Sequence, residues 1–121
     1  MPKKILICED DERLAKVLSD LLKDKGYEPF IELVEEKSCT ESCIEGRVQE
    51  AVLRTQPDYF ITDGLRGRYD CVIEAARRAK PGVIPIVFAA NADLILAARD
   101  KSYAAFQKHR IEEVLEFIEI G

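Results

Sequence analysis

The stretch KILICEDDE, residues 4–12, joins an apolar run to four consecutive acidic residues. An unbroken apolar run of this length is typical of a strand that is buried on both faces of a parallel sheet. The four carboxylates repel one another, and at an exposed helix start they would only favour the positive end of the helix dipole. At the end of a buried strand they would instead form a place to bind a cation or handle a phosphate. Asp11 is in addition a favourable helix N-cap residue.

Strand-like and helix-like segments alternate along the rest of the chain. The strand-like segments are 4–8, 29–34, 58–62, 83–90 and 103–107, and apolar residues at helical spacing follow them within 14–22, 44–52, 72–79, 94–99 and 111–118. Alternating βα units predict a parallel sheet with helices on both faces. We therefore expect an α/β fold and a single domain over residues 1–121.

Composition and charge exclude several classes of protein. The 121 residues are 47% hydrophobic, which is enough for a packed core, and carry a net charge of −5 without a basic stripe. A nucleic-acid-binding surface is therefore not expected. No segment is long enough to cross a membrane, and the apolar run after the first four residues is too short for a signal peptide. We expect a cytoplasmic protein with neither membrane nor nucleic acid among its partners.

The four cysteines fall into two groups. Cys8, in the first strand, and Cys71, in a helical pattern, are both expected to be buried as small hydrophobic residues. Cys39 and Cys43 lie four residues apart, but a zinc site would need two more ligands and the single histidine is His109. Zinc binding by this pair is therefore not favoured. A reversible disulfide stays open, although cytosolic thiols are normally reduced.

Polar residues follow the strands at the edge where a parallel sheet carries its functional crevice, outside the carboxyl ends of the strands. Residues far apart in the sequence should converge there: Glu9 and Asp10 after the first strand, Asp63 after the third, Ala90 and Asn91 after the fourth, and Lys108 after the fifth. Carboxylate oxygens suit Mg²⁺, and a further carboxylate can act as a nucleophile toward phosphorus, giving an aspartyl phosphate. A lysine would offset the charge on the phosphoryl oxygens.

Four stretches together resemble the receiver domain of bacterial two-component response regulators, and the similarity covers nearly the whole chain. They are KKILICEDDERLAKVLSDLLKDKGY (3–27), QPDYFITDGLRG (56–67), IPIVFAAN (84–91) and AFQKH (105–109). The first two are fairly specific together, whereas each alone would be weak. The resemblance implies a flavodoxin-like, doubly wound sheet of five parallel strands in the order 2-1-3-4-5.

The resemblance also implies roles for single residues. Asp63 would be the phosphoacceptor and Lys108 the lysine that contacts the phosphate. The Mg²⁺ ligands would be Glu9, Asp10, Asp63 and the backbone carbonyl of Leu65, and the phosphate-binding positions would be Ala90 and Asn91. A histidine kinase or a phosphotransfer protein would donate the phosphoryl group, and a downstream protein would read the result. Such a chain is a signalling module rather than an enzyme, and a monomer or weak homodimer.

Several positions depart from the family pattern. Ala90 stands where the family has Thr or Ser, and Ala105 where it commonly has Tyr or Phe, so the usual pair of switch residues is missing. His109 and Gly67 each replace a proline, and the segment 35–43 looks like an insertion. A cis peptide bond before a non-proline residue is costly, so a trans Lys108–His109 bond is expected, with a reshaped loop that could displace Lys108.

Two other functions stay open at this point. The domain could be an atypical receiver that binds proteins without phosphorylation, because Arg66 and Arg68 could neutralise the acidic site without a metal; the alternative for them is a solvated loop. A phosphatase with an Asp63 nucleophile is weaker, since such enzymes carry a second Asp where this chain has Leu65. The chain ends after its last predicted helix, which fits a stand-alone receiver or an excised piece of a longer protein.

Overall fold

The computed structural model describes residues 2–34 and 41–121, without the side chains of residues 41–43 and 66. Cys39 and the side chain of Cys43 lie outside this part of the chain, so the interpretations of that pair are not tested. Among the described residues, no helix combines the length and apolar character that crossing a membrane requires.

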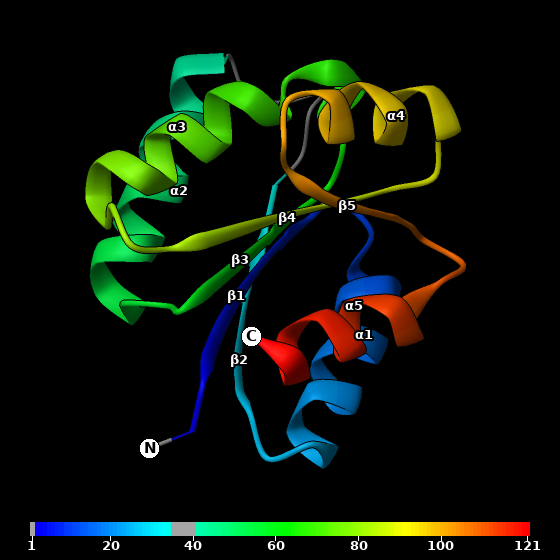
Figure 1. Ribbon diagram of the computed structural model, residues 1–121. Coiled ribbons are helices and arrows are strands. Elements are labelled where there is room, and N and C mark those ends of the chain that lie inside the picture. Colours follow the sequence, from blue (N-terminus) through cyan, green and yellow to red (C-terminus); the bar gives the residue numbers. More distant parts are fainter. Residues whose placement is uncertain (1, 35–40) are drawn as a thin grey trace.

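Five parallel strands form one sheet in the order β2-β1-β3-β4-β5 (Figure 1). The strands are β1 (Lys4–Glu9), β2 (Glu28–Leu33), β3 (Tyr59–Thr62), β4 (Ile84–Ala89) and β5 (Ala104–Gln107). The predicted flavodoxin-like fold and its strand order are therefore confirmed.

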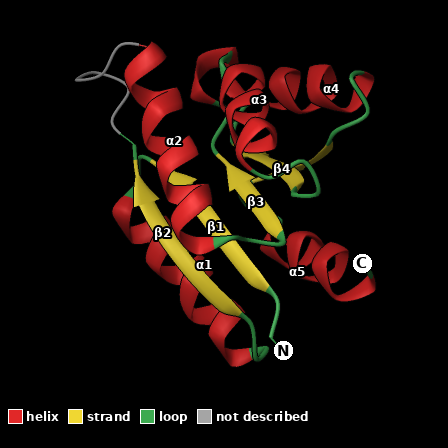
Figure 2. Ribbon diagram, turned by 90° about the vertical axis from the view of Figure 1, so that its left-hand side faces the viewer, coloured by secondary structure: helices red, strands yellow, loops and turns green. Residues whose placement is uncertain are grey.

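Helices cover both faces of the sheet (Figures 1 and 2). They are α1 (Glu12–Asp24), α2 (Glu41–Thr55), α3 (Tyr69–Ala79), α4 (Ala92–Asp100) and α5 (Ile111–Ile120), with a short 3₁₀ turn, η1 (Leu65–Gly67), before α3. Helices α1 and α5 lie together on one face, and α2, α3 and α4 cover the other. Each helix follows the strand that the alternating pattern assigned to it.

Strand β1 shows why its sequence is apolar without interruption. Leu6 and Cys8 belong to the core beneath α2 and α3, whereas Ile5 and Ile7 belong to the core beneath α1 and α5. Successive side chains of a strand point to opposite faces, so a central strand between two helical layers needs apolar residues at every position.

Asp11 begins α1 as predicted, because its side chain accepts hydrogen bonds from the backbone N–H groups of Arg13 (3.0 Å) and Leu14 (3.3 Å). Cys8 is buried, as expected, but the expectation for Cys71 is wrong, since its side chain is only half-buried. The buried face of α3 is centred on Val72, Ile73 and Ala76, and Cys71 lies at the margin of that face.

Candidate functional site

Four side chains meet at the carboxyl edge of the sheet. Glu9 is the last residue of β1, Asp10 follows it, Asp63 follows β3 and Lys108 follows β5. One carboxylate oxygen from each of the three acids lies within 4.8 Å of the others, and Lys108 Nζ is 2.8 Å from Asp63 Oδ1. The convergence expected from the carboxyl ends of parallel strands is therefore observed.

Backbone hydrogen bonds hold Asp63 and Lys108 in place. The N–H of Asp63 donates to the carbonyl oxygen of Cys8 at 3.0 Å, and the N–H of Lys108 donates to that of Ala89 at 3.1 Å. Each bond continues the ladder between two strands by one residue beyond the strand end. Both side chains therefore emerge from the rigid sheet rather than from a free loop.

Glu9 is the buried acid of the site, with 2% of the residue exposed. Its Oε1 accepts hydrogen bonds from Lys108 Nζ (2.9 Å) and from the N–H groups of Asp10 (3.1 Å) and Asp11 (3.4 Å). Burial raises the pKa of Glu9 to about 7, helped by its carboxyl–carboxyl hydrogen bond with Asp10 and by the charge of Asp63, although Lys108 opposes the shift. Glu9 is thus the acid of the site that binds a proton near neutral pH.

Asp10 is the exposed member of the pair. The hydrogen bond with Glu9 lowers the pKa of Asp10 and outweighs the opposing effect of burial, and the charge of Lys108 lowers the pKa further. The two carboxyl groups therefore differ: Glu9 is the one that takes up a proton near neutral pH, whereas the ionised form of the exposed Asp10 is favoured.

Lys108 bridges Glu9 and Asp63. Burial by itself lowers the pKa of Lys108, but the hydrogen bonds to Asp63 and Glu9 and the charges of both outweigh it, so that the net pKa is raised. The Lys108–His109 peptide bond is trans, as predicted. The displacement of Lys108 that this bond could have caused does not occur, since its Nζ contacts both acids.

The loop after Asp63 is tightly built. Leu65 is buried and has a φ of +49°, an uncommon value for a residue with a side chain. Its carbonyl oxygen accepts a hydrogen bond from the N–H of Arg68 at 3.0 Å, which leaves its second lone pair for another partner. A Cβ atom on Gly64 would lie 2.9 Å from Leu94 Cδ1 and 3.0 Å from Ala89 Cβ, so the loop rests directly against α4 and β4.

Ala90 and Asn91 are exposed and follow β4. Asn91 is the N-cap of α4, because its Oδ1 accepts hydrogen bonds from the N–H groups of Asp93 (2.8 Å) and Leu94 (3.3 Å). Sequence reasoning missed this role, although an Asn directly before an apolar helical pattern is a known signal. The amide nitrogen of Asn91 is not used by the cap, so its predicted contact with a phosphate stays a prediction.

A second polar cluster was not found from the sequence. Tyr69, at the start of α3, packs edge-on against Tyr103, with ring centroids 6.2 Å apart. Lys101 pairs with Asp70, and its Nζ lies 5.0 Å from the centroid of the Tyr69 ring. The cluster ties the start of α3 to the end of α4. No local pattern predicts it, because its members come from separate βα units.

The donor set at the carboxyl edge fits a hydrated divalent cation. Three carboxylates within reach of one ion are hard oxygen ligands, which Mg²⁺ prefers, and an exposed position such as that of Asp10 allows the ion to keep waters. Lys108, which contacts Asp63, supplies positive charge for an anionic group bound beside that carboxylate.

No protein-family model matches the chain. Two curated relatives, each named transcriptional regulatory protein PdtaR and coming from two strains of Mycobacterium tuberculosis, are 28% identical over 129 aligned residues. The alignment covers all of this chain but 57% of those proteins, so the chain spans little more than half of their length.

Solved structures of receiver proteins match almost the whole chain. A response regulator from Thermotoga maritima superposes with a TM-score of 0.75 at 17% identity, over 98% of this chain and 96% of its own. A CheY-like receiver domain protein from Methanospirillum hungatei gives 0.72 at 18% identity, over 98% and 92%. The chain therefore has the fold of response-regulator receiver domains.

Proposed function

We propose that the chain is a receiver domain that accepts a phosphoryl group on Asp63, in the presence of Mg²⁺, within a two-component phosphorelay. The observation that carries the proposal is the constellation around Asp63: two further carboxylates within 4.8 Å and an ammonium group 2.8 Å away. The fold shared with response regulators and the distant similarity to a transcriptional regulatory protein support it.

Mg²⁺ would be held by Asp10 and Asp63, with Glu9 and the carbonyl of Leu65 completing the protein ligands. Asp10 and Asp63 are the better candidates for direct contact, because Glu9 Oε1 already accepts hydrogen bonds from Lys108 and from two backbone N–H groups. When bound, the ion supplies positive charge to the phosphoryl oxygens. Binding would also favour the ionised form of Glu9 and so release its proton.

The transfer step needs a nucleophile and an electrostatic partner, and the chain has both. A carboxylate oxygen of Asp63 would attack phosphorus in the phosphohistidine of the donor. The new P–O bond forms as the P–N bond breaks, and the imidazole keeps the electron pair and takes up a proton. Lys108 is already within hydrogen-bond distance of Asp63, so its ammonium group can follow the charge onto a phosphoryl oxygen.

Partners follow from this chemistry. A histidine kinase or phosphotransfer protein would deliver the phosphoryl group in the cytoplasm, and a downstream protein would read the modified domain. The competing function, an interaction module whose acidic site is neutralised by arginine, has little support. Arg68 forms no ion pair with the acidic cluster among the described residues, and the side chain of Arg66 is not among them.

The test is incubation with acetyl phosphate and Mg²⁺, followed by intact mass measurement. We expect one added phosphoryl group, lost on hydroxylamine treatment and dependent on Mg²⁺. Asp63→Asn should give no adduct, whereas Asp20→Asn, on the exposed surface of α1, should react like the wild type. An unmodified wild-type protein at saturating donor would reject the proposal and favour the interaction module.

A further inference from the structure

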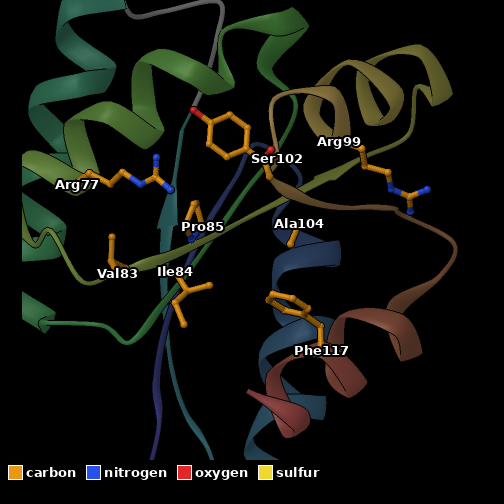
Figure 3. Close-up of a pocket in the computed structure, with 9 residues that line it drawn as sticks. Arg77, Val83, Ile84, Pro85, Arg99, Ser102, Ala104 and Phe117 are labelled. Carbon is orange, nitrogen blue, oxygen red and sulfur yellow. The ribbon is translucent and has the colours of Figure 1, made fainter.

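A cavity of about 530 Å³ lies between α3, the first residues of β4 and β5, and the end of α5. Figure 3 shows its lining, which includes Arg77, Pro85, Arg99, Ala104 and Phe117. Because the acidic site is at the carboxyl ends of the strands, this cavity is at the opposite end of the sheet. Its volume is within the range of ligand pockets, roughly 300–1,000 Å³.

The cavity opens where the ladder between β4 and β5 begins. The first paired residues are Ile86 and Ala104. Pro85 has no N–H to donate toward β5, so the ladder cannot continue by another rung toward the start of the strands. After α4 the chain turns at Ser102, which has a φ of +69°, and enters β5 only at Ala104. Within the described part of the chain, no strand therefore pairs with Pro85 on the β5 side.

The inner surface of the cavity is apolar. Val83 and Pro85 are buried, Phe117 is half-buried, and Ile84 presents 40% of its surface to solvent. Ile84 is one of the few large apolar side chains left exposed among the described residues. A partner could therefore bury one apolar side chain here and gain the usual stabilisation of apolar contact.

The charge of the cavity is positive within a protein of net charge −5. Arg77 and Arg99 line it, and no acidic side chain of the described residues does. Neither arginine forms an ion pair with a carboxylate of the described residues. Arg99 donates two hydrogen bonds to the carbonyl oxygen of Ala105 (3.1 and 2.8 Å), whereas Arg77 packs over Tyr103, 5.5 Å from the ring centroid, and donates no hydrogen bond to another described residue.

The two arginines differ in what they can offer a ligand. Figure 3 shows Arg77 extending from α3 toward the cavity, and Arg99 on the far side beside β5. The guanidinium group of Arg77 keeps its N–H donors for a ligand, and its planar fork matches a carboxylate. The helix ends nearest to the cavity are the carboxyl termini of α3 and α4, whose dipoles disfavour any anion, so the positive charge of the arginines has to outweigh them.

We propose that this cavity binds an acidic peptide segment of a partner protein, with a carboxylate on Arg77 and an apolar side chain against Ile84 and Phe117. We choose an acidic partner because its negative charge complements the arginines of the cavity, which is open at the edge of the sheet. The site does not involve Asp63 or a cation. Its failure in a test would therefore leave the proposed receiver function untouched, and the reverse also holds.

The experiment is a titration of the ¹⁵N-labelled protein, without Mg²⁺ or phosphodonor, followed by amide chemical shifts. The probe is a blocked peptide with one phenylalanine flanked by glutamates. We expect saturable shifts at Ile84, Tyr103 and Ala104. Arg77→Gln should weaken binding about tenfold, as expected for the loss of one charged hydrogen-bond pair. Asp63→Asn should bind like the wild type.

Arg78→Gln is the matched control. It removes the same charge from the next residue of α3, and Arg78 does not line the cavity. It should bind like the wild type. An equal loss in both arginine variants, or equal binding of the peptide with glutamines in place of glutamates, would overturn the proposal. Tighter binding of adenosine monophosphate than of the acidic peptide at the same amides would also overturn it, in favour of a nucleotide site.

Discussion

Lys108 Nζ lies 2.9 Å from Glu9 Oε1, although their strands, β5 and β1, are separated in the sheet by β3 and β4. The Glu9 side chain is 3% exposed and that of Lys108 is 21% exposed, so the pair is largely out of water. Its carboxyl member has a pKa of about 7 even with the lysine in contact. The electrostatics of the site therefore depend on whether Glu9 holds a proton.

The first prediction is a pH-dependent stability due to Glu9. Its pKa is about 7 in the folded chain against 4.5 as the ordinary value, so the folded state binds the proton more tightly. The contribution of Glu9 should be full below pH 4.5 and should disappear as the pH rises through 7, with a maximum of about 3 kcal/mol. Urea unfolding without divalent cations would measure it. The difference between wild type and Glu9→Gln should change over this interval, and a constant difference would contradict the raised pKa.

The second prediction concerns removal of the Lys108 ammonium group from its pair with Glu9. Lys108→Met should lower the free energy of unfolding by about 2 kcal/mol at pH 8, because a buried Glu9 carboxylate loses its partner. The loss should be smaller at pH 5, where Glu9 is protonated in either protein. Lys16→Met, on the exposed side of α1, is the control and should change stability little at both pH values. Equal losses for Lys108→Met at pH 5 and pH 8 would show that Lys108 does not act through Glu9.

A third prediction tests the packing of the loop after Asp63. Gly64→Ala should destabilise the fold by about 2 kcal/mol, since the new methyl group would overlap Leu94 and Ala89. Thermal unfolding of Gly64→Ala with Leu94→Ala should show less than the sum of the two single losses, because the smaller side chain relieves the overlap. Gly46→Ala, in α2 and with open space around its Cβ, should instead stabilise by about 0.5–1 kcal/mol.

A fourth prediction concerns the response to a phosphoryl mimic. We expect little change at β5, because Ala90 has no hydroxyl that could contact a phosphoryl group and Ala105 has no ring that could follow such a movement. With beryllofluoride and Mg²⁺, amide shifts should be large at residues 63–68 and 90–94, where Gly64 rests against Leu94, and small at residues 103–106. Asp63→Asn should show neither set. Large shifts across residues 103–106 would show that another route, such as the contact of Tyr69 with Tyr103, links the site to β5.

The sequence by itself determined the elements, their order and the four side chains at the carboxyl edge. Periodicity separates strands from helices, and right-handed βα units leave few arrangements of a parallel sheet. Strands of one parallel sheet end at the same edge, so Glu9, Asp10, Asp63 and Lys108 had to emerge together wherever the helices packed. The N-cap role of Asp11 was predictable as well, because the cap involves only residues close to it in the sequence.

Only the tertiary structure decided how neighbouring residues differ. Glu9 and Asp10 look alike in the sequence, yet Glu9 is buried and its pKa is raised to about 7, whereas Asp10 is exposed and its pKa is lowered. Lys108 kept its place despite the trans bond, and it pairs with the buried Glu9 and the half-buried Asp63. The half-buried Cys71 and the positive cavity around Arg77 depend on packing between distant units, and no local pattern encodes such contacts.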